Sequence, residues 1–188
     1  ICIKWLAHFH GNFLNTTPTG LWDTGTYWHL ATRLDELNAI NDPVLKKAAP
    51  LIEGQLNQCE FKTIVHGDAK VANFCFSENA VAAVDFQYVG GGCGMKDLAY
   101  FLGSTLSDDE IENNEAEILD FYFLELQKSM ELNKKNQFFQ KTKMQWLELY
   151  PFAWADFHRF LEGWRPGHWK LGAYSNEQLN LVYKKLNL

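Results

Sequence analysis

The sequence predicts an α+β fold in which a mostly helical domain carries a small β-hairpin region between residues 61 and 85. Two observations support this fold class. Outside that region, apolar residues recur at the three- to four-residue spacing of a helix face. Within it, short runs rich in β-branched and aromatic residues are separated by turn residues, which is typical of strands. With 188 residues, 47% of them hydrophobic, the chain is long enough to bury one core.

The first part of the chain predicts three helices ahead of the β region, one of them around Trp28, Ala31 and Leu34, which repeat at helical spacing. Apolar residues repeat at helical spacing over Ile1 to Leu14, which favours a helix there. Asp42 followed by Pro43 is typical of an N-cap and a first-turn proline, so a third helix is expected to begin at this point. Pro50 is expected to kink or split that helix, because proline lacks a backbone N–H.

Three short strands are predicted in the β region, over Phe61–His66, Asn73–Ser77 and Ala80–Asp85. The two residues between the second and third strands favour a tight turn. A glycine-rich tract follows at Gly90 to Gly94. It lacks the G-K-[ST] ending of a P-loop, so we expect a mobile loop there and not a phosphate cradle.

The remaining chain predicts helices again. Ser107 and Glu110 have the spacing of a capping box and are expected to open a long helix. The stretch from Asn136 to Gly163 is strongly aromatic and predicts two helices joined near Pro151. A final helix is expected to reach Leu188.

Composition excludes several classes of partner. The formal net charge is −6, which does not match the basic footprint of a nucleic-acid-binding protein. No run of 18 apolar residues exists, so the sequence predicts no membrane span. The four cysteines contain no C-x-x-C pair and are interpreted as reduced thiols, as in a cytoplasmic protein.

The polar residues around the predicted strands suggest phosphoryl-transfer chemistry. Asp68 follows the first strand, Asn73 lies five residues later, and Asp85 ends the third strand. A loop leaving one strand and a hairpin returning beside it would bring these side chains to one end of a small sheet. One carboxylate could then accept the proton of an attacking hydroxyl, while amide and carboxylate oxygens suit magnesium. The alternative is a simple turn at His66 to Asp68 with an Asx hydrogen bond.

The stretch from residue 64 to residue 104 resembles the aminoglycoside phosphotransferase and choline kinase superfamily, which has a protein-kinase-like fold. The segments Asp85-Phe-Gln and Asp97-Leu-Ala-Tyr-Phe-Leu are most similar to its ecdysteroid-kinase-like (CHK kinase-like) branch. The resemblance implies an ATP- and magnesium-dependent phosphotransferase that moves the γ-phosphate to a hydroxyl of a small molecule. A pseudokinase or binding module without transfer activity, and a metal-dependent phosphohydrolase, are the alternatives.

The resemblance also implies a role for each matching residue. Asp68 corresponds to the catalytic base, and Asn73 and Asp85 correspond to the ligands of magnesium and hence of the nucleotide. Asp97, together with His66, corresponds to the structural brace of the catalytic loop. Lys70 follows Asp68 by two residues and could touch the transferred phosphate as a point charge, or it could be an ordinary solvated lysine.

Two departures from protein kinases indicate a small acceptor. Gly67 stands where protein kinases carry an arginine that commonly pairs with a phosphorylated activation loop. Only eleven residues separate Asp85 from Asp97, which leaves no room for a long segment that holds a peptide. Both features favour a small-molecule acceptor over a protein acceptor.

No glycine-rich strand-turn-strand precedes the 66–73 segment. We therefore expect residues 1–188 to form a single kinase-like carboxy-terminal lobe, with the amino-terminal nucleotide-binding lobe absent from this chain. That lobe would be its partner, and the chain alone is expected to be an inactive fragment because a kinase cradles ATP between both lobes.

The acceptor pocket is less well defined by sequence. A cluster of aromatic and charged residues lies downstream, at Trp154, Asp156, Phe157, His158, Arg159 and Trp164. Aromatic faces with a carboxylate would suit a cationic acceptor. The favoured alternative is ordinary helix packing with a surface ion pair.

Overall fold

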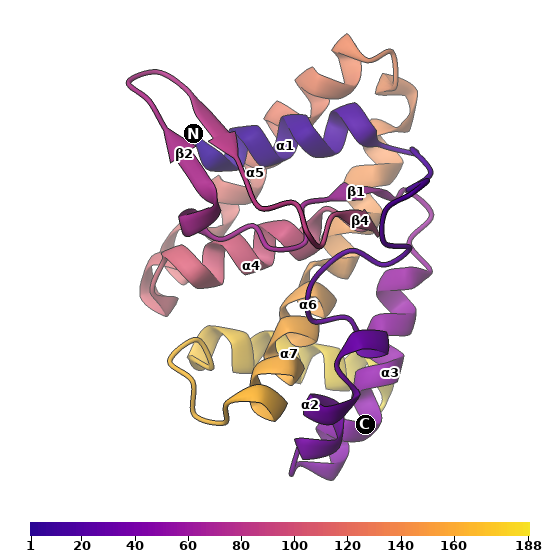
Figure 1. Cartoon of the computed structure of the whole chain (residues 1–188), viewed down its shortest axis with the longest axis vertical. Coiled ribbons are helices and arrows are strands. Elements are labelled where there is room, and N and C mark those ends of the chain that lie inside the picture. The colour runs from indigo at the N-terminus through magenta and orange to yellow at the C-terminus, as the bar shows by residue number, and fades with distance from the viewer.

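Seven α-helices account for most of the chain in the computed structural model, which describes all of residues 1–188 (Figure 1). Four strands of three residues each complete the fold, so the predicted α+β, mostly helical class is confirmed. The elements in chain order are α1 (Cys2–Phe13), α2 (Leu34–Ala39), α3 (Pro43–Asn57), β1 (Thr63–Val65), β2 (Phe74–Phe76), β3 (Val81–Ala83), β4 (Gly90–Gly92), α4 (Met95–Thr105), α5 (Asp108–Leu132), α6 (Phe139–Trp164) and α7 (Ala173–Leu186). Single 3₁₀ turns lie at Leu30–Thr32, Val71–Asn73 and Asn136–Phe138.

The strands form two separate antiparallel pairs and not one small sheet. β2 and β3 make the expected hairpin, with Phe74 opposite Ala83, and this hairpin projects from the body beside the amino terminus (Figure 1). β1 pairs with β4, so that Thr63 lies opposite Gly92. The three predicted strands therefore exist, but each is shorter than expected, and the first pairs with a segment that the sequence did not indicate as a strand.

The prediction of a mobile loop at Gly90 to Gly94 is wrong. Gly90 to Gly92 form a buried strand, and the Trp22–Gly25 segment lies against its other side. Gly91 donates its N–H to Trp22 O over 3.0 Å and accepts from Gly25 N over 2.8 Å. A Cβ built on Gly90 or Gly91 would overlap the backbone of Trp22 or Asp23. These glycines permit a close approach of two backbones, which is the other common reason for glycine in a strand.

The prediction of two helices joined near Pro151 is wrong, because α6 is one helix through this proline, and α3 is likewise not split at Pro50. An interior proline costs roughly 3 kcal/mol through its missing N–H and its clash with the preceding turn. In α3, buried side chains flank the proline on both sides, with Ala49 before it and Ile52 after it. α6 is buried over most of its length. Burial of apolar surface on both sides outweighs the lost hydrogen bond in each helix.

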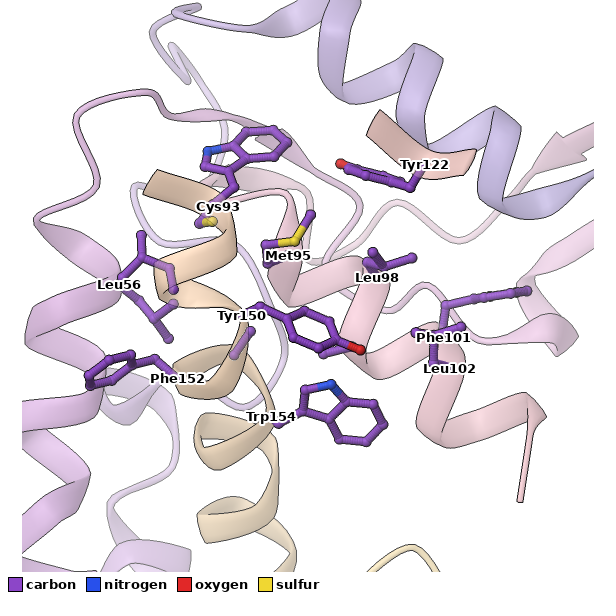
Figure 2. Close-up of a cluster of buried hydrophobic side chains, with 14 of the residues drawn as sticks. Leu56, Cys93, Met95, Leu98, Phe101, Leu102, Tyr122, Tyr150, Phe152 and Trp154 are labelled. Carbon is purple, nitrogen blue, oxygen red and sulfur yellow. The ribbon is translucent and has the colours of Figure 1, made fainter. Parts of the chain in front are cut away.

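α6 runs through the middle of the molecule and is the main support of the core (Figure 1). Tyr150 and Trp154 of α6 point toward α4, where Leu98 and Leu102 lie, while Phe152 lies on the other side of the helix (Figure 2). α1 packs along α5 across the top of the view in Figure 1. α4 is thereby held between the α1/α5 pair and α6, and almost all of its residues are buried.

None of the helices combines the length and the apolar character that crossing a lipid bilayer requires.

Candidate active site

The loop that follows β1 is shaped by Gly67. Gly67 has φ +84°, a left-handed conformation that favours glycine. A Cβ at this position would overlap the carbonyl oxygen of Tyr88 and lie 2.8 Å from the backbone nitrogen of Thr26. The loop over residues 66–73, here called the 66–73 loop, therefore turns in a tight space between two other segments. Glycine at position 67 has a local structural reason, independent of phosphorylation control.

Replacing Gly67 with alanine should lower the free energy of unfolding by ~2 kcal/mol or more, since it adds a backbone overlap to the cost of an unfavourable φ. Gly20 is the matched control, because its φ is +76° and nothing lies within 4 Å of a Cβ built there. Gly20→Ala should cost only about 1 kcal/mol, which is the conformational part alone. Denaturant unfolding of both variants measures the difference. Equal losses would mean that the 66–73 loop can relax around the new methyl group.

Asp97 of α4 anchors the 66–73 loop through two hydrogen bonds to its backbone. Its Oδ2 accepts the N–H of His66 over 2.6 Å, and its Oδ1 accepts the N–H of Gly67 over 2.9 Å. His10 of α1 lies 3.1 Å from Asp97 Oδ2 through Nε2, and its Nδ1 lies 2.7 Å from the hydroxyl of Tyr122. A proton on His10 Nε2 satisfies both contacts. Three elements distant in sequence therefore meet at one buried carboxylate.

Electrostatics keep Asp97 ionised. Burial alone would raise the pKa of the Asp97 carboxyl, but the hydrogen bond from His10, the charges of His10 and His66, and the Gly67 N–H hold it below its ordinary value. A carboxylate that accepts several N–H donors favours its charged form in this way.

Asp68 is the centre of a second buried network. Its side chain is 5% exposed and receives three donors. Tyr100 OH donates to Oδ1 over 3.0 Å, while Asn73 Nδ2 and Lys70 Nζ each donate to Oδ2 over 2.9 Å. The side chain of Lys70 is 40% exposed, so its ammonium group is accessible to a ligand at the surface. The structure thus brings Asp68, Lys70 and Asn73 into direct contact.

Asp85 lies beside this network without joining it. It is exposed, and its φ of +63° is uncommon for a residue other than glycine. The preceding residue, Val84, donates its N–H to Asn73 O over 2.9 Å and accepts from His66 Nε2 over 2.9 Å. These two bonds place the backbone of Asp85 next to the 66–73 loop. A non-glycine residue in a strained conformation next to a polar cluster is a reason to suspect function.

Asn73 and Asp85 offer oxygen atoms of the chemical type that magnesium binds. Asn73 uses its amide nitrogen on Asp68, with bonds to both Oδ2 and the backbone oxygen, which turns its amide oxygen away from that carboxylate. Asp85 takes part in no hydrogen bond or ion pair of the protein through its side chain. An amide oxygen and a free carboxylate are hard ligands of the kind that magnesium takes alongside water and phosphate oxygens. No group of three or more His, Cys, Asp or Glu side chains gathers anywhere in the chain, so the candidate ligands here are one amide and one carboxylate.

Sequence reasoning missed Tyr100 and His10, the two side chains that contact Asp68 and Asp97 from other parts of the fold. Tyr100 lies three residues after Asp97 in α4, and residues at this spacing share a helix face. This spacing could have predicted that Tyr100, like Asp97, points from α4 toward the 66–73 loop. His10 gave no comparable signal, because its partner lies 87 positions away.

The residues expected near an acceptor pocket are mostly internal. Asp156 and Arg159 are fully buried, and the expectation of a surface ion pair is wrong. Asp156 accepts from Arg159 over 2.6 Å and from Trp28 Nε1 over 2.8 Å, and Lys96 Nζ lies 3.4 Å away. Burial would raise the pKa of Asp156, but the charges of Arg159 and Lys96 hold it below its ordinary value. This network ties the segment around Trp28 to α4 and α6.

The other members of that cluster divide between core and surface. Trp154, Phe157 and His158 are buried, and burial lowers the pKa of His158 to about 4, so it is neutral at physiological pH. Trp164 at the end of α6 is exposed. Phe157 packs against the Asp68 network, with its ring centroid 4.8 Å from that of Tyr100.

Comparison with known proteins identifies the family. The model of the ecdysteroid kinase-like family matches residues 4–135, a range that includes Asp68, Asn73, Asp85 and Asp97. Searches of curated proteins and of solved structures found no significant match. The match covers more than half of the chain and confirms the resemblance seen in the 64–104 stretch. The chain therefore belongs to the ecdysteroid kinase-like family.

Proposed function

We propose that this chain supplies the catalytic lobe of an ATP- and magnesium-dependent phosphotransferase that moves the γ-phosphate to a hydroxyl of a small molecule. The observation that carries the proposal is the network at Asp68. A buried carboxylate is fixed by Tyr100 and Asn73, and a half-exposed lysine stands beside it. Phosphoryl transfer depends mainly on positioning and on charge neutralisation, and this network supports both.

Asp68 is the proposed base. A carboxylate offers about four lone-pair sites, and three of them receive donors from Tyr100, Asn73 and Lys70. One site is left to orient the acceptor hydroxyl and take its proton. Burial, with the nearby charges of Tyr27 and Asp68, raises the pKa of Tyr100 far above its ordinary value. Tyr100 therefore stays protonated and keeps donating to Asp68.

Lys70 and the two metal ligands would handle the charge of the phosphates. Lys70 can leave Asp68 Oδ2 and approach the transferred group, since its side chain is 40% exposed. Asn73 and Asp85 would hold magnesium, which when bound neutralises negative charge on the phosphoryl group. Asp97 would fix the position of the 66–73 loop, and His66 would fix the position of Val84, the residue before Asp85, through their hydrogen bonds.

An exposed apolar surface and a buried strand support the remaining parts of the proposal. Apolar side chains of the hairpin and of the segment after it are exposed, namely Phe76, Val84 and Phe86, and the last two flank Asp85 in sequence. An amino-terminal lobe that cradles ATP would cover such a surface. The segment between Asp85 and Asp97 is taken up by the buried strand β4, which supports a small-molecule acceptor over a peptide.

A transfer assay with the intact enzyme tests the proposal. Magnesium–ATP and a panel of hydroxylated small molecules are supplied, and phosphorylated product is separated from free phosphate. Phosphorylated product supports phosphotransfer, free phosphate alone would indicate a hydrolase, and nucleotide binding without either product would indicate a binding module.

Asp85→Asn should raise the magnesium concentration needed for half-maximal transfer by about tenfold or more, because a charged ligand of the ion is lost. Asp35→Asn is the matched control, since Asp35 is an exposed aspartate on α2 without a proposed role. Magnesium titrations of the transfer rate give both values. An unchanged titration in Asp85→Asn would remove Asp85 from the proposed metal site.

A further inference from the structure

Lys170, in the loop between α6 and α7, has its ammonium group close to three aromatic rings. Its Nζ lies 4.9 Å from the ring centroid of Tyr100, 5.4 Å from that of Trp169 and 5.5 Å from that of Phe157. Three rings within about 6 Å of one cation is the arrangement by which proteins recognise ammonium groups. We call these three rings, contributed by α4, α6 and the α6–α7 loop, the aromatic box.

Lys170 forms neither an ion pair nor a hydrogen bond through Nζ, although it is half-buried. Burial and the charge of Lys70 lower the pKa of Lys170 to about 8, while the charge of Asp68 opposes the shift. The rings are therefore the main direct contacts that compensate the ammonium for lost water. A chain seldom buries a cation without a carboxylate unless the position has a use.

Two aspartates line the same pocket as Lys170, and both have structural roles at helix ends. Lys170 lines a pocket of about 460 Å³ together with Trp169, Asp108 and Asp109. Both aspartates stand in the first turn of α5, where negative charge stabilises the helix. The carboxylate of Asp108 also lies against Gly172, the N-cap of α7. Neither aspartate pairs with Lys170.

The aromatic box adjoins the proposed base. Tyr100 forms one wall of the box and donates its hydroxyl to Asp68 Oδ1 over 3.0 Å. An acceptor whose hydroxyl reaches Asp68 would therefore come close to Tyr100 and to the aromatic box. If that acceptor carried an ammonium group near its hydroxyl, the aromatic box would be the natural place for the charge, but Lys170 already fills it.

We propose that Lys170 is a specificity-determining residue, whose own ammonium occupies a cation site beside Asp68 and so excludes cationic acceptors in favour of uncharged or anionic alcohols. Repulsion of the wrong ligand is a common source of specificity. The specificity role rests on the proposed phosphotransfer, whereas the occupied cation site can be tested without it. The inference reverses the expectation that aromatic side chains near Phe157 would suit a cationic acceptor.

Binding of tetramethylammonium to the chain, followed by calorimetry or by tryptophan NMR signals without nucleotide, tests the occupied site. Lys170→Ala should bind this ion at least about tenfold more tightly than the unaltered chain, because the rings become available to it. Lys170→Arg should not gain binding, since it keeps a cation in the box. Lys184→Ala is the matched control, because Lys184 is an exposed lysine of α7.

If Lys170→Ala does not fold, as judged by its thermal unfolding, Lys170→Gln replaces it, since glutamine is shorter than lysine and uncharged. Equal binding by the unaltered chain and by the folded variant overturns the proposal, and so does the absence of binding in both. Because no nucleotide is present, either result is independent of whether the intact enzyme transfers phosphate. In an enzyme that does transfer, Lys170→Ala should also begin to accept alcohols that carry a quaternary ammonium group.

Discussion

Asp68→Asn should lower the turnover number of the intact enzyme by ~10²–10⁴-fold, the usual contribution of a general base. Its affinity for magnesium–nucleotide should change little, because Asn73 and Asp85 are the proposed metal ligands. The new side chain keeps an oxygen for Tyr100 but places an NH₂ group where Asn73 and Lys70 now donate. It therefore loses both the base and the two donors that orient it. Steady-state rates at saturating substrates, with nucleotide binding measured separately, test this expectation.

Two comparisons make the Asp68 result specific. Tyr100→Phe leaves the carboxylate intact and removes one donor, so its turnover should fall by a smaller factor, on the order of tenfold, as expected for one hydrogen bond to a charged group. Asp35→Asn should have the rate of the unaltered enzyme. Full turnover in Asp68→Asn at saturating substrates would contradict the assignment of Asp68 as base, whatever the behaviour of the two comparison variants.

The parts of the candidate site that the sequence predicted are those with short spacing. Asp68 and Asn73 are five residues apart, and the single 3₁₀ turn between them returns the amide to the carboxylate. The β2–β3 hairpin then brings Val84 back to Asn73. Local turn chemistry and strand pattern are enough to predict contacts of this kind, because few other conformations satisfy them.

The parts that sequence reasoning missed depend on contacts between distant segments. β4 pairs with β1 on one side and with the Trp22–Gly25 segment on the other. No residue near Gly90 in the sequence indicates either partner. The position of Asp156 is a second example, because its partners Trp28 and Lys96 lie far away along the chain. A sequence shows that such residues are polar or small, but not which partner makes their burial favourable.

The prolines illustrate a different limit. Proline has a strong local preference against helix interiors, and this preference alone predicts a kink or split at Pro50 and a junction of two helices near Pro151. Tertiary packing keeps both helices continuous, since α6 is buried along most of its length and α3 is buried on both sides of its proline. Local propensity is a weak guide wherever an element is enclosed by its neighbours.

Asp97→Asn should lower the free energy of unfolding by about 3 kcal/mol at neutral pH, because it disrupts a buried carboxylate with three N–H donors. An asparagine at this position has one acceptor oxygen, which can replace either Oδ1 or Oδ2 of Asp97 but not both. Its NH₂ group must then face the N–H of His66 or Gly67, or the imidazole of His10. The 66–73 loop would lose a support and the site above it would become less well positioned.

The pH dependence of this loss separates the charge of Asp97 from its shape. The pKa of Asp97 is lower in the folded chain than its ordinary value, so between the two values the unfolded state binds more protons and stability rises with pH. This contribution is fully present above about pH 4, the ordinary range of the group, and is lost as the pH falls through the folded-state pKa. The difference in unfolding free energy between the unaltered chain and Asp97→Asn should therefore narrow at acid pH.

Denaturant unfolding of the unaltered chain, Asp97→Asn and a control at several pH values measures this difference. Glu112→Gln is the control, because Glu112 is an exposed acid of α5 that forms no hydrogen bond or ion pair through its side chain, and it should follow the unaltered chain at every pH. A constant gap between Asp97→Asn and the unaltered chain from neutral to acid pH would contradict the charge argument. It would mean that Asp97 supports the loop through its shape, with no contribution from ionisation.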